Sequence, residues 1–100
     1  MQELIDKVQE LVAFELERAN TIHPPKFNSY HEAYAVILEE LEEAKDELEY
    51  TDFHLGNMWE HVKDDETEDV FSSLTSIETT AIRAAAEAIQ VAAMAQKARM

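Results

Sequence analysis

Apolar residues recur every three or four positions along most of this chain, which is the spacing of one face of an α-helix. The pattern breaks at residues 20–29 (NTIHPPKFNS), where two prolines push the residue before them out of helical geometry. A first helix is therefore predicted over roughly residues 1–19, and we expect its broad apolar face to pack across the rest of the chain. This face contains Leu4, Ile5, Val8, Leu11 and Val12.

Two longer helices are predicted after the break, because their apolar positions alternate steps of three and four as in a coiled-coil seam. Ser29 and Glu32 have the spacing of a capping box, which indicates where the second helix begins. Its seam positions are Tyr34, Ile37, Leu41, Ala44, Leu48, Thr51, Leu55, Met58 and Val62. The seam positions of the third helix are Val70, Leu74, Ile77, Ala81, Ala84, Ala88, Val91, Ala95 and Ala98.

The acid-rich residues 63–69 (KDDETED) separate these two helices. Asp65 and Glu68 have capping-box spacing there, so we place the turn near Asp65 and begin the third helix after it. The fold class predicted is all-α: a three-helix subunit with a long antiparallel helical hairpin, which assembles into a helical bundle. We expect a homo-oligomer, a dimer or a tetramer, because the shorter first helix cannot cover both long helices.

Composition narrows the class of protein. A chain of 100 residues with 46% hydrophobic residues forms one folded domain, residues 1–100. Its net charge of -14 repels nucleic acid and anionic membranes, so we expect neither as a partner. The N-terminus is acidic and periodic, unlike a signal peptide, and no stretch of about 18 apolar residues occurs, so we expect a cytoplasmic protein.

The densest run of acidic residues lies in the second helix. Residues 35–50 (AVILEELEEAKDELEY) contain seven carboxylates and one lysine. Like charges three or four residues apart on a helix destabilise it, so such a run indicates either a solvated face or a bound cation.

Helix geometry places some of these acids beside the seam. If the turn is centred near Asp65, the numbers of facing residues add to about 130. The facing pairs are then Glu43 with Glu87, Glu40 with Gln90, and Glu47 with Arg83. Converging carboxylates repel each other or raise their pKa values unless a hard cation such as Mg²⁺ neutralises them. The metal ligands predicted are Glu40, Glu43, Glu87 and Gln90, and the alternative is an acidic surface that is merely solvated.

Parts of the second and third helices resemble a known family. The motif EELEE at Glu39–Glu43 fits the E-E-x-x-E pattern of the MazG-like, all-α nucleotide pyrophosphohydrolases, in which a later E-x-x-D completes a magnesium site. The stretches FNSYHEAYAVILEELEEAKDEL and EAIQVAAMAQK resemble small phage and prophage members of this family. Together these stretches cover about a third of the chain.

The resemblance implies an activity and a role for each residue. Members of the family hydrolyse a nucleoside triphosphate to the monophosphate and pyrophosphate with the help of Mg²⁺. By position, Glu40 and Glu43 would be metal ligands, Glu39 a catalytic residue that orients water, and Glu87 the glutamate of the second pair. Gln90 stands where the family has aspartate, and an amide oxygen brings no charge, so a weakened site is expected.

A literal E-x-x-D occurs at Glu66 and Asp69, but we do not assign it to the metal. Both residues lie at the predicted turn, about 30 Å along the helix axis from Glu43. They are better explained as acids that stabilise the start of the third helix.

Three cations near the end of the chain are candidates for holding phosphate oxygens: Arg83, Lys97 and Arg99. An ion pair with a glutamate is the alternative for Arg83, and stabilisation of the helix C-terminus is the alternative for Lys97 and Arg99. For the protein as a whole, the alternative to an enzyme is a non-enzymatic helical module for oligomerisation or protein interaction.

Overall fold

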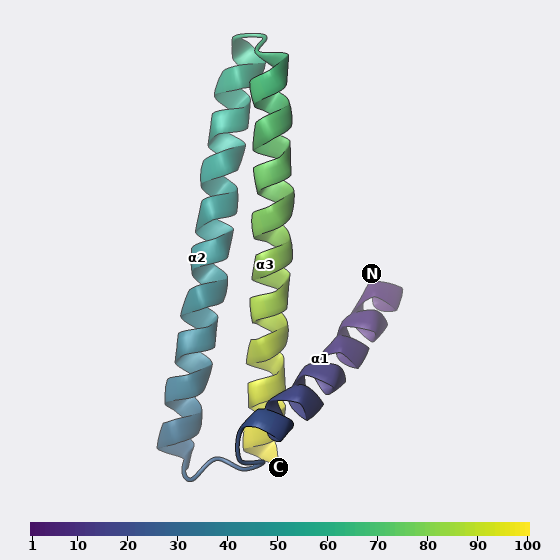
Figure 1. Cartoon of the computed structure of the whole chain (residues 1–100), viewed down its shortest axis with the longest axis vertical. Coiled ribbons are helices and arrows are strands. Elements are labelled where there is room, and N and C mark those ends of the chain that lie inside the picture. Colours follow the sequence, from purple (N-terminus) through teal and green to yellow (C-terminus); the bar gives the residue numbers. More distant parts are fainter. The chain divides into compact units, whose positions relative to one another are not determined.

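The computed structural model describes all 100 residues, and 88% of them are helical, with no strand. The three helices are α1 (Gln2–Ile22), α2 (Tyr30–Lys63) and α3 (Thr67–Arg99). The two long helices, α2 and α3, run antiparallel and pack against each other (Figure 1). The prediction of an all-α subunit with a long helical hairpin is therefore confirmed.

None of the three helices combines the length and the apolar character that crossing a membrane requires.

The contacts within the chain group into two compact units. The first unit contains Met1–Glu42 and Glu87–Met100, and the second contains Glu43–Ala86. The second unit is thus the part of the hairpin that includes the turn, and the first contains α1 with the outer ends of α2 and α3.

The ends of the helices follow local sequence signals. At the start of α2, the Ser29 hydroxyl accepts a hydrogen bond from the backbone N–H of Glu32 (3.1 Å), as the capping box predicts. The Glu32 carboxylate accepts from the side-chain amide of Asn28 (2.9 Å) instead of returning to the Ser29 backbone. The predicted cap is therefore half formed, with Asn28 supplying the second donor.

The turn lies at Asp65, which adopts a left-handed backbone with φ 57°, as predicted. The predicted capping box of Asp65 and Glu68 does not form. α3 begins at Thr67, and the carbonyl of Glu66 accepts its first helical hydrogen bond from the N–H of Val70 (3.0 Å). Because Asp65 supplies the left-handed turn residue, it lies one position too early to cap the helix.

The register of the hairpin agrees with the prediction in both units. In the second unit the hydroxyls of Thr51 and Thr80 lie 2.7 Å apart, and in the first unit the Gln90 amide lies against the Glu40 carboxylate. Both pairs fall within one residue of the predicted register.

The seam predicted for each long helix consists of two columns of residues seven positions apart, and only one of the two columns lies in the interface. The column of Ala44 and Ala84 lies in the interface, but Leu48, Leu55 and Leu74 are 58%, 54% and 46% exposed. The interface uses instead the neighbouring, more polar column, which contains the buried Ser73 and Thr80. Small side chains let two helices approach closely, and large leucines are then displaced to the outside of the pair.

The main core lies in the first unit, where the C-terminal half of α1 packs against α3 (Figure 1). Val12 and Ala19 from α1 meet Ala93 and Met94 from α3. Residues packed around this cluster are Leu16, Phe27, Val36, Ile37, Ile89 and Ala92. Of the apolar face predicted for the first helix only Val12 is buried, since the N-terminal half of α1 has no neighbour in its unit.

Candidate metal centre

Two carboxylates from different helices meet in the first unit. Glu40 on α2 and Glu87 on α3 are both half-buried, and each offers an oxygen within 4.8 Å of the other. The two helices present these side chains at one level because Glu40 and Gln90 face each other in the hairpin register. The predicted convergence of Glu40, Glu87 and Gln90 is therefore present.

Gln90 joins the two carboxylates. With its amide nitrogen facing them, it donates hydrogen bonds to Oε2 of Glu40 (2.6 Å) and to Oε2 of Glu87 (2.9 Å). In the opposite orientation its oxygen would face the two carboxylates and its nitrogen would face only donors, so the first orientation is the one that satisfies the amide. The Gln90 amide therefore bridges the two carboxylates as a hydrogen-bond donor.

Glu15 and Arg18 of α1 lie behind this amide. Arg18 donates to both carboxylate oxygens of Glu15, from Nε at 2.8 Å and from Nη2 at 2.6 Å. These hydrogen bonds, together with the charge of Arg18, lower the pKa of Glu15, while partial burial opposes the shift. Glu15 therefore stays ionised and carries a negative charge beside Gln90.

The contribution of α1 was not predicted from the sequence. Glu15 lies between Val12 and Ala19 on the buried face of this helix, at spacings of three and four residues. A carboxylate within an apolar face, with an arginine three residues later, is a signal that could have identified it.

The other predicted ligand and the predicted catalytic residue lie on α2. Glu43 follows Glu40 by one helical turn and so lies on the same side of α2. Glu39 immediately precedes Glu40, is exposed, and is turned about 100° around the helix from it. The roles of Glu43 as ligand and of Glu39 in orienting water remain predictions.

The predicted phosphate-holding cations have different surroundings. Arg83 is exposed, lies one turn before Glu87 on α3, and makes no ion pair with Glu47, the partner that the register gave it. Lys97 lies ten residues after Glu87, about 15 Å further along α3, and is buried. Lys97 is therefore not a neighbour of the carboxylate pair, whereas Arg83 is near Glu87 along the helix. Arg99, in the last turn, is exposed.

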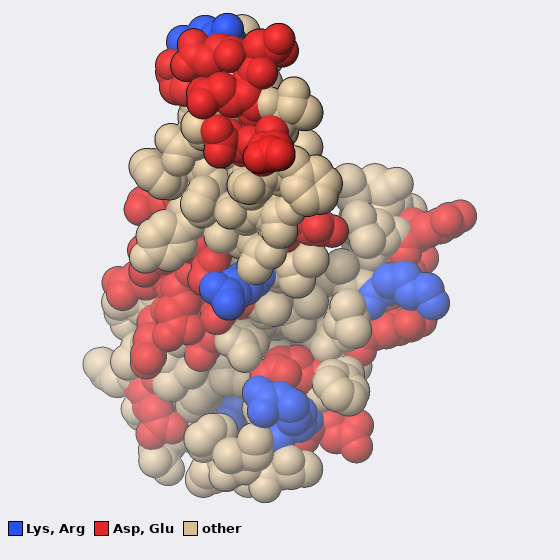
Figure 2. Space-filling model, turned by 45° about the horizontal axis from the view of Figure 1, so that its top comes forward, with Lys and Arg blue, Asp and Glu red and all other residues tan.

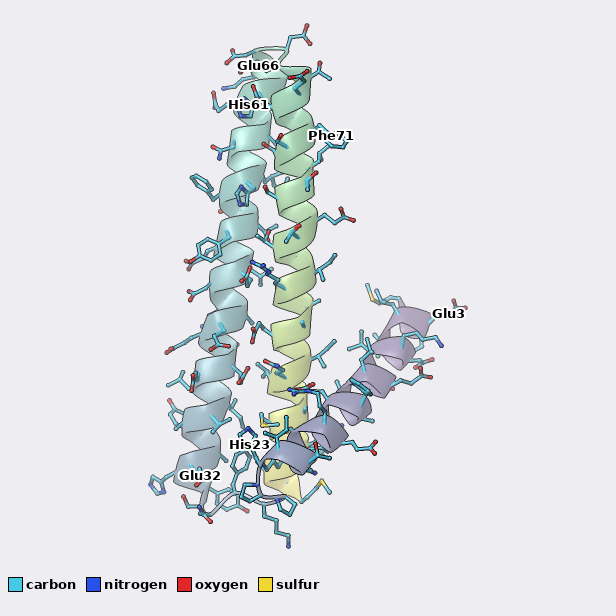
Figure 3. All side chains as sticks on the ribbon, viewed as in Figure 1. Glu3, His23, Glu32, His61, Glu66 and Phe71 are labelled. Carbon is cyan, nitrogen blue, oxygen red and sulfur yellow. The ribbon has the colours of Figure 1, made fainter.

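A second group of potential ligands lies in the second unit, at the turn of the hairpin. Nδ1 of His61 is 3.1 Å from Oε1 of Glu66 and 4.0 Å from Oδ2 of Asp69, and Figure 3 shows His61 and Glu66 together at this turn. Many other acidic side chains crowd the same tip (Figure 2). The role predicted for Glu66 and Asp69 as helix-start acids agrees with their place in and before the first turn of α3.

The donor set around Glu40 and Glu87 suits Mg²⁺ better than a softer metal. Carboxylate and amide oxygens are hard ligands, and no cysteine or histidine takes part. The amide of Gln90 donates to both carboxylates, so its oxygen would reach a cation only after the amide turned over. These residues therefore fit a divalent cation that takes oxygen ligands.

Comparison with known proteins gives no match: no family model, curated protein or solved structure is significantly similar to this chain.

Proposed function

We propose that this protein is a Mg²⁺-dependent nucleoside triphosphate pyrophosphohydrolase, which adds water between the α- and β-phosphates to give the monophosphate and pyrophosphate. The observation that supports it most is the meeting of Glu40 and Glu87 around the Gln90 amide. The resemblance of residues 39–43 and 87–97 to the MazG-like family supplies the reaction. A cytoplasmic location, where such substrates are abundant, belongs to the same proposal.

Each residue has a role in this proposal. Glu40, Glu43 and Glu87 hold the cation with their carboxylates, and Gln90 contributes its amide oxygen. Bound Mg²⁺ supplies positive charge for the phosphate oxygens and lowers the pKa of a coordinated water. Glu39 orients the attacking water. Arg83, an exposed cation near Glu87 on α3, binds a phosphate oxygen of the substrate.

The uncharged Gln90 distinguishes this set from the family pattern. With three carboxylates and an amide, the site holds Mg²⁺ more weakly than a set of four carboxylates, because one negative charge is absent. Gln90→Asp should therefore increase pyrophosphate release at low magnesium concentration.

An assay of product identity tests the enzyme proposal. Common and modified nucleoside triphosphates are incubated with the protein and Mg²⁺, and pyrophosphate and phosphate are measured separately. The native chain should release pyrophosphate, Glu40→Gln should not, and Glu42→Gln should match the native rate because Glu42 is an exposed glutamate of the same helix. Phosphate as the only product, or equal rates for both variants, would contradict the proposal.

Assembly with a second copy of the chain is part of the proposal. The large apolar residues that lie outside the interface of α2 and α3 form an exposed column, which includes Leu41, Leu48 and Leu55 on α2 and Leu74 on α3. A stripe of this kind on a long helix is typical of a bundle interface. A dimer or tetramer of this chain would cover it.

The same exposed column favours the alternative, a non-enzymatic helical module for oligomerisation or protein interaction. In this function Glu40 and Glu87 need no metal, and the Gln90 amide bridges them permanently. The product assay separates the two functions, because only the enzyme releases pyrophosphate.

A further inference from the structure

A buried lysine lies in the first unit, away from the carboxylate pair. Lys97 is only 6% exposed, and its Nζ lies 4.6 Å from the centre of the Phe27 ring. It forms no ion pair or side-chain hydrogen bond, even though the chain carries 22 acidic residues. A contact with an aromatic face offsets only part of the cost of burying an ammonium group, so an anionic partner is the missing element.

Two cavities meet at this lysine. The more polar of the two has a volume of 270 Å³ and walls that include Asn28, Ser29 and Tyr30 at the start of α2. The other has a volume of 220 Å³ and more apolar walls that include Val36 and Met94. Lys26, Phe27 and Lys97 line both cavities.

The only acidic side chain in the walls of these cavities is already engaged. Glu32 lines the second cavity, but its carboxylate accepts from the side-chain amide of Asn28 at 2.9 Å. The Ser29 hydroxyl, which accepts from the N–H of Glu32, keeps its own hydrogen available as a donor. The polar cavity therefore combines Lys26 and Lys97 with a hydroxyl donor.

We infer that these cavities form an anion-binding site that takes a phosphate group, either as inorganic phosphate or as a small phosphomonoester. Two lysines match the charge of a phosphate dianion, and Phe27 holds Lys97 in place. The polar cavity is slightly smaller than the pockets of about 300 Å³ and more that hold drug-sized ligands, which suits a small anion. The apolar cavity beside it would receive the organic part of a monoester.

This site is separate from the candidate metal centre. Lys97 lies about 15 Å beyond Glu87 along α3, so a phosphate held by a cation at Glu87 does not reach it directly. The inference therefore does not depend on the proposed enzymatic function, and it can be tested with EDTA present and no divalent cation.

The experiment is a titration of the full chain with sodium phosphate in EDTA, followed by calorimetry and by amide chemical shifts, with sodium chloride at matched ionic strength as reference. Phosphate should bind saturably and shift the amides of Phe27, Asn28 and Ser29. Chloride should not do so, since a chain of net charge -14 repels anions in general. Absence of saturable binding, or equal shifts with chloride, would overturn the inference and leave Lys97 with a structural role.

Variants locate the site. Lys97→Met keeps most of the length of the side chain and removes the buried charge, so it should fold and should weaken phosphate binding by at least about tenfold. Lys45→Met is the matched control, because Lys45 is exposed and forms no ion pair, and it should bind like the native chain. Equal weakening in both variants would overturn the site. If Lys97→Met does not fold, the chemical shifts of the native chain decide the matter.

Phenyl phosphate distinguishes the two sources of the phosphate group. Tighter binding than inorganic phosphate supports a monoester with its ring in the apolar cavity, and equal or weaker binding supports inorganic phosphate as the ligand. Binding of phenyl phosphate that Lys97→Met leaves unchanged would show that only the apolar cavity is used, and would overturn the inference.

Discussion

The hydroxyl of Thr51 on α2 lies 2.7 Å from the hydroxyl of Thr80 on α3, and the two share a hydrogen bond within the interface of the hairpin. Each hydroxyl also lies beside a carbonyl of its own helix, that of Glu47 at 2.9 Å and that of Ser76 at 2.9 Å. One threonine can therefore donate across the interface while the other donates to its own backbone. This contact fixes the register of the second unit.

A double-mutant cycle should show that these two threonines are coupled. Each single substitution, Thr51→Val or Thr80→Val, already removes the hydrogen bond between the two hydroxyls. The double substitution should therefore cost less than the sum of the two, by a coupling free energy of about 1 kcal/mol. Urea unfolding measures it. The control pair is Thr51→Val with Thr75→Val, because Thr75 is exposed and bonds only to its own helix, and its effects should add. Additive effects in both pairs would show that the register is different.

The register could be predicted from the sequence because a single turn fixes it. The acid-rich residues 63–69 and the capping-box spacing of Asp65 and Glu68 placed the turn near Asp65, and the constant rise of a helix then set every facing pair in the hairpin. Thr51 with Thr80 and Glu40 with Gln90 agree with it.

The face of contact could not be predicted in the same way. The seam predicted from the sequence placed Leu48 and Leu55 in the interface together with Ala44, but the leucines are exposed and Thr80 lies in the interface with Ala44 in their place. A pattern of apolar residues does not say which of two adjacent columns meets the partner helix and which faces away from it. Glu15 was missed for a related reason, since the angle at which α1 crosses the other helices is not encoded in its periodicity.

Glu47 should destabilise the hairpin through its unpaired charge. Its Oε2 is buried without a hydrogen-bond partner, although its residue as a whole is only half-buried. Glu47→Gln removes the charge and should raise the free energy of unfolding by about 1 kcal/mol. Denaturant unfolding checks this, with the exposed Glu49→Gln as control. A loss of stability in Glu47→Gln alone would show that the carboxylate has a partner.

The pair of Glu15 and Arg18 should make the free energy of unfolding depend on pH in the acidic range. Because Arg18 lowers the pKa of Glu15, the carboxylate adds stability at pH values above the unfolded pKa, and this stability is lost as the pH falls through the lower, folded pKa. In Arg18→Gln, less stability should therefore be lost below about pH 4.5, which is the ordinary pKa of glutamate.

Unfolding curves measured between about pH 6 and about pH 3 test this effect. Lys7→Gln is the control, since Lys7 pairs with Glu10 at 3.6 Å between two largely exposed side chains. The interpretation fails if Arg18→Gln and the native chain lose stability in parallel over this range.

The exposed leucine column should hold an oligomer together. The native chain should sediment as a dimer or a tetramer at micromolar concentration, and the double variant Leu48→Ser, Leu55→Ser should shift toward monomer while remaining helical by circular dichroism. Tyr50→Ser is the control, because Tyr50 is equally exposed but lies on another side of α2. A native chain that sediments as a monomer would contradict the assembly.

Calorimetry of magnesium binding tests the central claim most directly, because the metal centre and the enzymatic function both depend on it. The native chain should bind Mg²⁺ and melt at a higher temperature in its presence than in sodium chloride of the same ionic strength. Glu43→Gln and Glu40→Gln should lose most of this gain, Glu42→Gln should keep it, and Gln90→Asp should increase it. If the native chain binds no Mg²⁺ and none of these substitutions changes its response to magnesium, the metal centre does not exist and the protein is a helical interaction module.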